Sequence, residues 1–274
     1  MPYEFIVTLS TIPSKLKDLP ATLDSIVNQT LKAKKIILQI PETYDFRLKG
    51  QSINTGLLDS IKRKYGKYGL EVNVCKNDDG PGTKLVGLLE QIPLQSFGPN
   101  QKIVVLDDDL IYNRKSLEYV KNALEKASSP LNASFYTYKM EDITVGQGAD
   151  VFVLEPNALE DYLAFFYKVK NSKDGKFILH HDDVILSYYL NQTNNPVVQM
   201  DSPPGNTYEE QKSTHVNALH NLQGEYSRDN LNRNVLQKLR EVSETQTEGF
   251  GTMSQHVTVM QKWTNFLRAC GYMC

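Results

Sequence analysis

Hydrophobic positions follow two different periods along the first two-thirds of the chain. Short apolar runs, typical of buried strands, are separated by segments in which apolar residues recur at helical spacing. The predicted strands are residues 5–9, 35–40, 70–74 and 102–106, and the predicted helices between them lie near 19–27, 57–65 and 84–90. This β-α-β-α-β-α-β order favours a parallel sheet with helices on both faces.

After Asn113 the pattern becomes less regular. It predicts helices near 115–127 and 183–190 and strands at 134–138, 150–154 and 196–200. From about Gly224 polar residues dominate, which predicts an exposed connection to a C-terminal helix at 257–267. We therefore expect one α/β domain, residues 1–223, and a C-terminal helical extension, residues 224–274, packed on the same domain.

Composition excludes several classes of protein. The chain has 274 residues, 40% of them hydrophobic, which is enough for an ordinary globular core. A net charge of -2 gives no electrostatic reason to bind nucleic acid or an anionic membrane. No apolar run is long enough for a membrane span, and no secretory signal pattern is present. The cysteines (Cys75, Cys270 and Cys274) form neither a disulfide framework nor a zinc pattern, so we expect a cytoplasmic protein.

Three consecutive aspartates, Asp107, Asp108 and Asp109, follow the fourth predicted strand. Open α/β sheets bind ligands beyond the carboxyl ends of their strands. Adjacent carboxylates repel one another, and a divalent cation that holds a diphosphate is the simplest way to offset that repulsion. The alternative is a solvated acidic turn, but three carboxylates in a row favour the cation site.

Hydroxyl groups end the first predicted strand, at Thr8, Ser10 and Thr11. Hydroxyls at this position can bond the edge of a nucleotide base or a ribose. The alternative is that they cap a turn before Pro13, which is a common role for Ser and Thr.

A glycine-containing loop, Asp78-Asp-Gly-Pro-Gly-Thr-Lys84, leads into the third predicted helix. Glycine lets the backbone approach a ligand closely, and helix N-termini favour phosphate, so Asp79, Thr83 and Lys84 are candidate donor-binding residues. The alternative is an ordinary Asp-Gly turn with Thr83 as the helix cap. A second small-residue segment, Gly146-Gln-Gly-Ala149, either lets a sugar lie against the backbone or is a plain loop.

In the order and spacing of these segments the chain resembles glycosyltransferases of the GT-A fold, over roughly residues 3–222. Asp107-Asp-Asp109 stands where that family has its D-x-D motif. The segments Val7-Thr-Leu-Ser-Thr-Ile-Pro-Ser-Lys15 and Gly80-Pro-Gly-Thr-Lys84 are similar to those of the small family-2-like enzymes of large DNA viruses.

The resemblance implies a metal-dependent enzyme that transfers a sugar from a nucleotide-sugar donor, expected to be a UDP-sugar, to a hydroxyl of a glycan acceptor with inversion. It implies Mn²⁺ or Mg²⁺ bound by Asp109, with Asp107 assisting, and a late histidine, His220 or else His215, as a further ligand. It implies that Asp183 is the general base, with Asp182 as the fallback, although this pair also fits a helix cap. The residues expected at the donor are Thr8, Ser10, Thr11, Asp79, Thr83, Lys84, Asp107 and Asp108.

Two other functional classes are considered. Nucleotidyltransferases share the sheet architecture but show a G-x-G-T-R-like loop after the first strand, where this chain has Leu9-Ser-Thr-Ile-Pro13. A non-catalytic sugar- or nucleotide-binding module would need neither the three aspartates nor the Asp182-Asp183 pair. The sugar, the acceptor, retention as opposed to inversion, and the oligomeric state are left open by the sequence.

Overall fold

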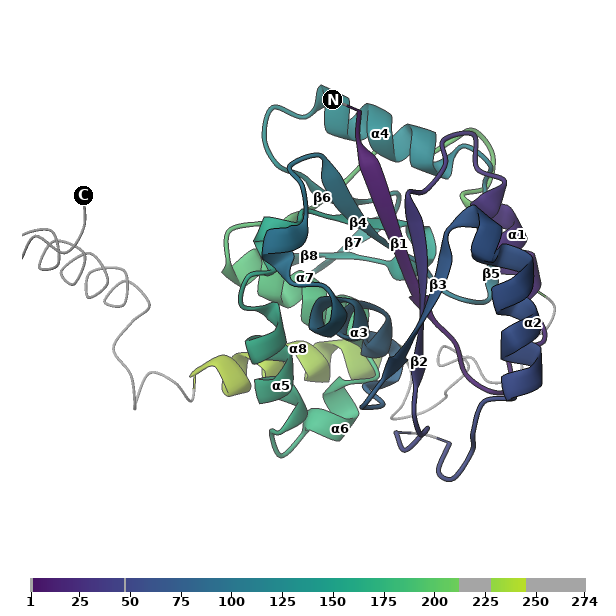
Figure 1. Cartoon of the computed structure of the whole chain (residues 1–274). Coiled ribbons are helices and arrows are strands. Elements are labelled where there is room, and N and C mark those ends of the chain that lie inside the picture. Colours follow the sequence, from purple (N-terminus) through teal and green to yellow (C-terminus); the bar gives the residue numbers. More distant parts are fainter. Residues whose placement is uncertain (1, 47, 212–227, 245–274) are drawn as a thin grey trace, which may run out of the picture.

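A seven-stranded sheet, in the order β10-β6-β9-β4-β1-β2-β3, is the centre of the computed structural model, which describes residues 2–46, 48–211 and 228–244 (Figure 1). The pairs β1–β2, β2–β3, β1–β4 and β6–β10 are parallel, whereas β9 runs antiparallel to β4 and β6. The strands are β1 (Glu4–Ser10), β2 (Lys35–Pro41), β3 (Leu70–Cys75), β4 (Gln101–Val105), β6 (Asn132–Ser134), β9 (Phe152–Leu154) and β10 (Val197–Gln199). The predicted fold class, a mixed α/β protein with a mostly parallel sheet, is confirmed.

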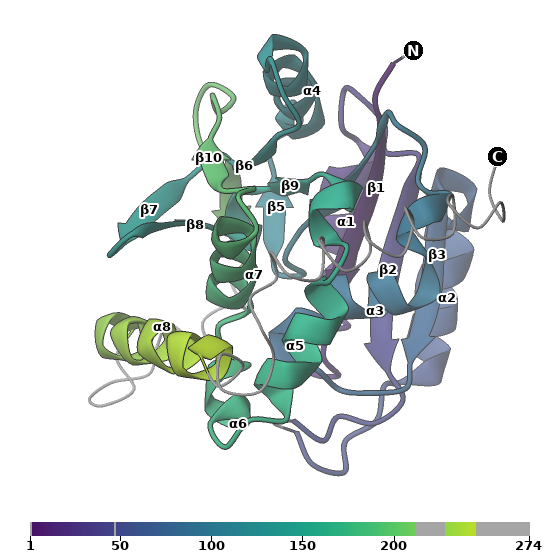
Figure 2. The same ribbon diagram turned by 90° about the vertical axis from the view of Figure 1, so that its left-hand side faces the viewer.

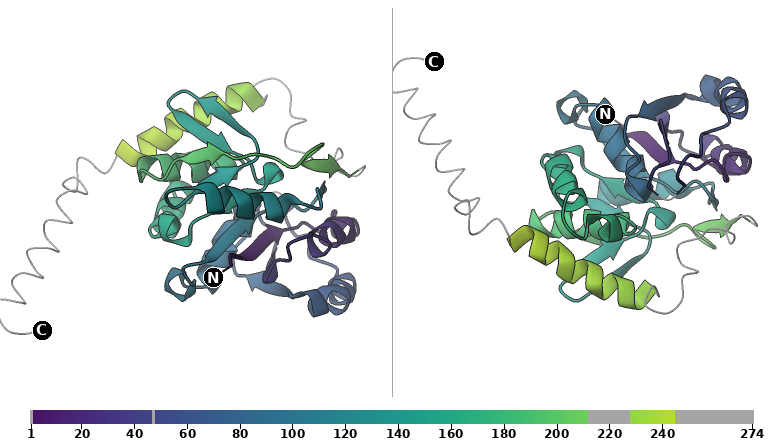
Figure 3. Two further views of the ribbon diagram at one scale, coloured as in Figure 1. Left: turned by 90° about the horizontal axis from the view of Figure 1, so that it is seen from above. Right: turned by 90° about the horizontal axis from the view of Figure 1, so that it is seen from below.

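Helices cover both faces of this sheet. Alternate residues of β1 point to opposite faces: Phe5, Val7 and Leu9 pack against α1, α2 and α4, whereas Ile6 packs on the side of α3, α5 and α7. The helix α8 lies outside α5, α6 and α7, on the side of the sheet opposite to α1 and α2 (Figures 2 and 3). The helices are α1 (Leu19–Val27), α2 (Thr55–Tyr65), α3 (Thr83–Gln91), α4 (Ser116–Lys126), α5 (Tyr162–Lys170), α6 (Gly175–Ile178), α7 (Asp182–Gln192) and α8 (Arg228–Glu244). No helix within these described ranges combines the length and apolarity that crossing a membrane requires.

Two short antiparallel ribbons flank the main sheet. One pairs β5 (Leu110–Tyr112), which begins directly after Asp109, with β11 (Tyr208–Glu210). The other pairs β7 (Thr137–Met140) with β8 (Ile143–Gly146), and β8 packs along α7. The ribbons place chain segments that are distant in sequence beside the ends of β4 and α7.

Two predictions about elements are wrong. Residues 134–138 are not one strand, because the chain leaves the main sheet after β6 and starts the separate ribbon at β7. The expected exposed connection after Gly224 is, over residues 228–244, the helix α8, whose residues Val235, Leu236 and Leu239 are fully buried in the core. The predicted helix at 257–267 and the expected domain boundary after residue 223 lie outside the described residues.

Candidate active site

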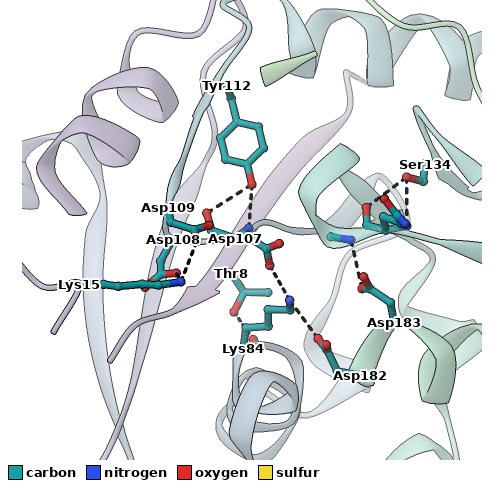
Figure 4. Close-up of polar contacts among 12 residues, drawn as sticks. Thr8, Lys15, Lys84, Asp107, Asp108, Asp109, Tyr112, Ser134, Asp182 and Asp183 are labelled. Carbon is teal, nitrogen blue, oxygen red and sulfur yellow. Dashed lines mark hydrogen bonds and ion pairs between the residues drawn. The ribbon is translucent and has the colours of Figure 1, made fainter. Parts of the chain in front are cut away.

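The three aspartates form the tight connection between β4 and β5. The amide of Asp107 donates to the hydroxyl of Tyr112 at 2.7 Å, and the same hydroxyl donates to the Asp107 carbonyl at 3.3 Å. The Thr22 hydroxyl, from α1, donates to the Asp108 carbonyl at 2.8 Å. Tyr112 and Thr22 are buried, so the backbone of this acidic turn is fixed by groups inside the protein; Figure 4 shows the contacts of Tyr112.

Two lysines bring positive charge to these carboxylates. Lys15 Nζ lies 2.7 Å from Asp109 Oδ2 and 3.4 Å from Asp108 Oδ1. Lys84 Nζ, from the start of α3, lies 2.7 Å from Asp107 Oδ1. Burial opposes the charge on each lysine, but the neighbouring aspartates outweigh it and raise the pKa of both ammonium groups. The repulsion that the sequence indicated is therefore partly offset by residues of the chain itself.

The second acidic pair reaches the same place from the first turn of α7. Asp182 Oδ2 lies 2.9 Å from Lys84 Nζ, so one ammonium joins the end of β4 to the start of α7 (Figure 4). Asp183 Oδ1 accepts the amide hydrogen of Gly148 at 3.0 Å. Burial, with the charge of Asp182, raises the pKa of Asp183 to about 8, although Lys84 opposes the rise. Asp183 therefore exchanges a proton near neutral pH.

The turn after β8 brings its backbone against this cluster. A Cβ at Gly148 would lie 3.1 Å from Lys84 Nζ and 3.3 Å from Asp107 Oδ1, so a side chain would crowd both groups. Val151, at the end of the turn, has a φ of 59°, an unfavourable conformation for a β-branched residue. The Ser134 hydroxyl, which bonds the Asp150 carbonyl at 3.1 Å, helps to hold the turn in this conformation. The turn formed by Gly146-Gln-Gly-Ala149, for which the sequence left a sugar contact or a plain loop open, thus packs against the acidic cluster.

Thr8 is a supporting residue in this structure. Its side chain is fully buried. Its hydroxyl donates to the Lys84 carbonyl and accepts a hydrogen bond from Gln39 Nε2 at 3.3 Å. Both partners lie inside the protein, so the expected contact of this hydroxyl with a nucleotide has no support here. Ser10 is half-buried at the end of β1 and Thr11 is buried beside it.

The loop before α3 is also held by internal contacts. Asp79 is 2% exposed, and its Oδ1 lies 2.5 Å from Lys170 Nζ. Its amide donates to Thr83 Oγ1 at 3.0 Å, so Thr83 supports the loop from within the first turn of α3. Burial raises the pKa of Asp79, and Lys170 opposes the rise. Lys170 belongs to α5, a helix that the sequence pattern did not indicate.

The acidic cluster suits a hard divalent cation. Four carboxyl groups, those of Asp107, Asp108, Asp109 and Asp182, pair with the ammonium groups of Lys15 and Lys84. Asp183 adds negative charge beside Lys84, and burial raises the pKa of Asp108. A bound diphosphate would add further negative charge, and a divalent cation would offset that charge. Across the described residues, no group of three or more His, Cys, Asp or Glu side chains is arranged to hold a metal ion. A cation bound here would have to be held by one or two of these carboxylates and completed by phosphate oxygens and water. His215 and His220 lie outside the described residues.

No protein-family model and no curated protein sequence matches the chain. Among solved structures it is similar to S. aureus TarS, with 16% identity and a TM-score of 0.47 over 77% of this chain and 37% of the TarS chain. It is also similar to the mannosyltransferase PcManGT from Pyrobaculum calidifontis, solved with GDP-Man and Mn²⁺, with 10% identity and a TM-score of 0.43 over 97% and 81% of the two chains.

A structure of 4-diphosphocytidyl-2C-methyl-D-erythritol synthase is similar to the same extent, with 11% identity and a TM-score of 0.43 over 73% of this chain and 90% of that one. The chain spans well under half of the TarS chain. Likeness at this level carries no functional argument, so we infer the function from the site.

Proposed function

We propose that this chain is a metal-dependent glycosyltransferase of the GT-A type, which transfers a sugar from a UDP-sugar to a hydroxyl of a glycan acceptor with inversion. One observation carries the proposal: two acidic groups from distant segments, at the end of β4 and at the start of α7, meet at the buried ammonium of Lys84. A transferase of this class needs a site for a diphosphate and, beside it, a proton acceptor.

The donor side is the edge formed by the ends of β1 and β4. Ser10, Thr11 and Asp108 are the proposed contacts to the nucleoside, and Asp107 and Asp109 would hold Mn²⁺ or Mg²⁺. The bound cation would supply positive charge to the diphosphate as it departs. The site has more carboxylates than ammonium groups, so the chain alone does not neutralise a bound diphosphate. This surplus of negative charge supports the role of the cation.

The acceptor side is the start of α7. We assign the general base to Asp183 and not to Asp182, because Asp182 is held by the Lys84 ammonium at 2.9 Å. In the reaction, the acceptor oxygen forms a bond to the anomeric carbon while the bond to the diphosphate oxygen breaks. The acceptor proton passes to the Asp183 carboxylate and then to solvent. A base with a pKa near 8 is close to the working pH, where proton transfer is most effective.

A crystal soaked with UDP and Mn²⁺ tests the placement of the donor. We expect nucleotide density along Ser10 and Thr11 and metal density beside Asp109. Density confined to another face of the sheet would refute the proposed site. The same soak with the Asp109→Asn variant is the control. In this variant the metal density should be lost before the nucleotide density.

A further inference from the structure

We propose that Thr8, Gln39 and Asn73 form a hydrogen-bonded chain that positions Lys84 between Asp107 and Asp182. The three residues lie on the adjacent strands β1, β2 and β3, and the chain of bonds ends on the backbone of α3. Its consequence for sugar transfer rests on the proposed function, whereas the positioning of Lys84 does not.

Hydrogen bonds connect every link of this chain. Asn73 Nδ2 donates to Gln39 Oε1 at 2.7 Å, and Gln39 Nε2 donates to Thr8 Oγ1 at 3.3 Å. The Thr8 hydroxyl then donates to the carbonyl of Lys84 itself. Asn73 Nδ2 also reaches the carbonyl of Gly87, one turn further along α3, at 3.2 Å. The sheet therefore holds two successive turns of this helix.

These polar residues replace apolar ones that the sheet would otherwise favour. Gln39 and Thr8 are fully buried, while Leu38 and Ile37 beside Gln39 are ordinary core residues. Burying an amide or a hydroxyl is unfavourable unless it is hydrogen-bonded, and an apolar residue of similar size would fill the same space without that requirement. The hydrogen bonds explain why these residues are polar: Thr8 bonds the backbone of α3, and Gln39 bonds Thr8.

The helix approaches the sheet closely at this point. A Cβ at Gly87 would lie 2.5 Å from Cys75 Sγ and 2.9 Å from Gln39 Oε1, so only glycine lets α3 come this near. Close approach brings the carbonyls of Lys84 and Gly87 within reach of side chains from the strands. The position and rotation of the first turn of α3, and with them the start of the Lys84 side chain, are thereby fixed. A displacement of about 1 Å in such a group can cost about 100-fold in rate.

The test uses near-isosteric variants and a readout that needs no substrate. Thr8→Val removes the hydroxyl but keeps the shape, and Thr8→Ser restores the hydroxyl. Trace acetylation with acetic anhydride, followed by peptide mass spectrometry, measures how accessible each lysine amine is in the folded protein. Lys102 is an internal control, because it is buried to the same degree (7% exposed, against 8% for Lys84) and is paired with Glu155 at 2.9 Å.

We expect Thr8→Val to raise the acetylation rate of Lys84 about five- to tenfold relative to Lys102, as the loss of one hydrogen bond of about 1 kcal/mol would. Thr8→Ser should stay close to the wild-type ratio. Gln29→Leu is the matched control variant, because Gln29 is another buried glutamine, whose amide bonds the Asn113 carbonyl at 2.7 Å. It should lower stability without changing the ratio.

An unchanged ratio of Lys84 to Lys102 acetylation in Thr8→Val would overturn the positioning role, even if both rates rise equally. In the transfer reaction we expect Thr8→Val to lower kcat with little change in the donor KM, and Thr8→Ser to recover it. If the acetylation pattern is as expected but no transfer occurs with the wild-type protein, the proposed function fails and the positioning of Lys84 stands.

Discussion

The ammonium nitrogen of Lys84 lies 2.7 Å from Oδ1 of Asp107, at the point where β4 ends. The same nitrogen lies 2.9 Å from Asp182, so a single buried cation connects the proposed donor side to the proposed acceptor side. This contact makes Lys84 important both for stability and for the electrostatics of the site.

Removing this ammonium should destabilise the fold. Lys84→Met keeps the length of the side chain but leaves Asp107 and Asp182 without their partner. We expect a loss of about 3 kcal/mol in the free energy of unfolding, near the low end for a broken buried pair because Asp107 is 32% exposed. Urea unfolding measures it. Lys34→Met is the control, because its pair with Glu4 is exposed on both sides (43% and 44%) and should be worth less than about 1 kcal/mol. Equal losses in the two variants would contradict the role of Lys84.

Asp109 should determine the metal requirement. Asp109→Asn removes a charged oxygen ligand, so we expect activity to fall by about 100-fold or more and the Mn²⁺ concentration for half-maximal activity to rise. EDTA should have the same effect on the wild-type protein. Asp201→Asn, whose carboxyl group is 82% exposed, is the matched control and should change neither quantity. Full turnover in EDTA would exclude a metal-dependent reaction.

Asp183 should be needed for transfer but not for donor binding. Asp183→Asn removes the proton acceptor while keeping the shape of the group, so transfer should fall about 10²- to 10⁴-fold. The affinity for UDP with Mn²⁺, measured by calorimetry, should be little changed. Near-normal transfer by this variant would remove Asp183 from the mechanism. An α-linked product from an α-linked donor would argue against inversion.

The raised pKa of Asp183 also predicts how stability depends on pH. The folded protein keeps this proton up to a pKa of about 8, whereas the unfolded chain releases it near 3.8. The contribution of this proton to stability is therefore complete below about pH 4 and is lost as the pH rises through about 8. Metal-free wild-type protein should lose more stability between pH 6 and pH 9 than Asp183→Asn, measured by urea unfolding in EDTA. Identical slopes for the two proteins would contradict the raised pKa.

The strands and helices of the first 113 residues could be predicted because their apolar residues follow simple local patterns. The segments 5–9 and 102–106 are mostly apolar and too short for an ordinary helix, which favours buried strands. The helix α8 was missed because its buried residues Val235, Leu236 and Leu239 stand among many polar ones. Its burial depends on tertiary contacts with α5, α6 and α7, and these helices are remote from it in sequence.

The acidic residues of the site could also be predicted, because carboxylates after a buried strand or before a helix are visible in the sequence. Their partners could not. The contacts of Lys15 with Asp109 and of Lys170 with Asp79 join residues 94 and 91 positions apart. No local pattern specifies them. Thr8 was expected to face a nucleotide because it lies near the end of a strand, but its buried hydroxyl bonds the Lys84 carbonyl and Gln39, which are distant in sequence. The metal-binding role of His220 or His215 stays a prediction, since both lie outside the described residues.

A donor screen tests whether this protein transfers sugar from a nucleotide-sugar. The protein is incubated with UDP-, GDP- and dTDP-sugars in the presence of Mn²⁺, and the released nucleotide is identified by chromatography. We expect UDP to be released from at least one UDP-sugar, Asp109→Asn to abolish the release, and added glycan acceptors to be glycosylated. Release of no nucleoside diphosphate from any donor, or synthesis of a nucleotide-sugar with release of pyrophosphate, would contradict the proposed function.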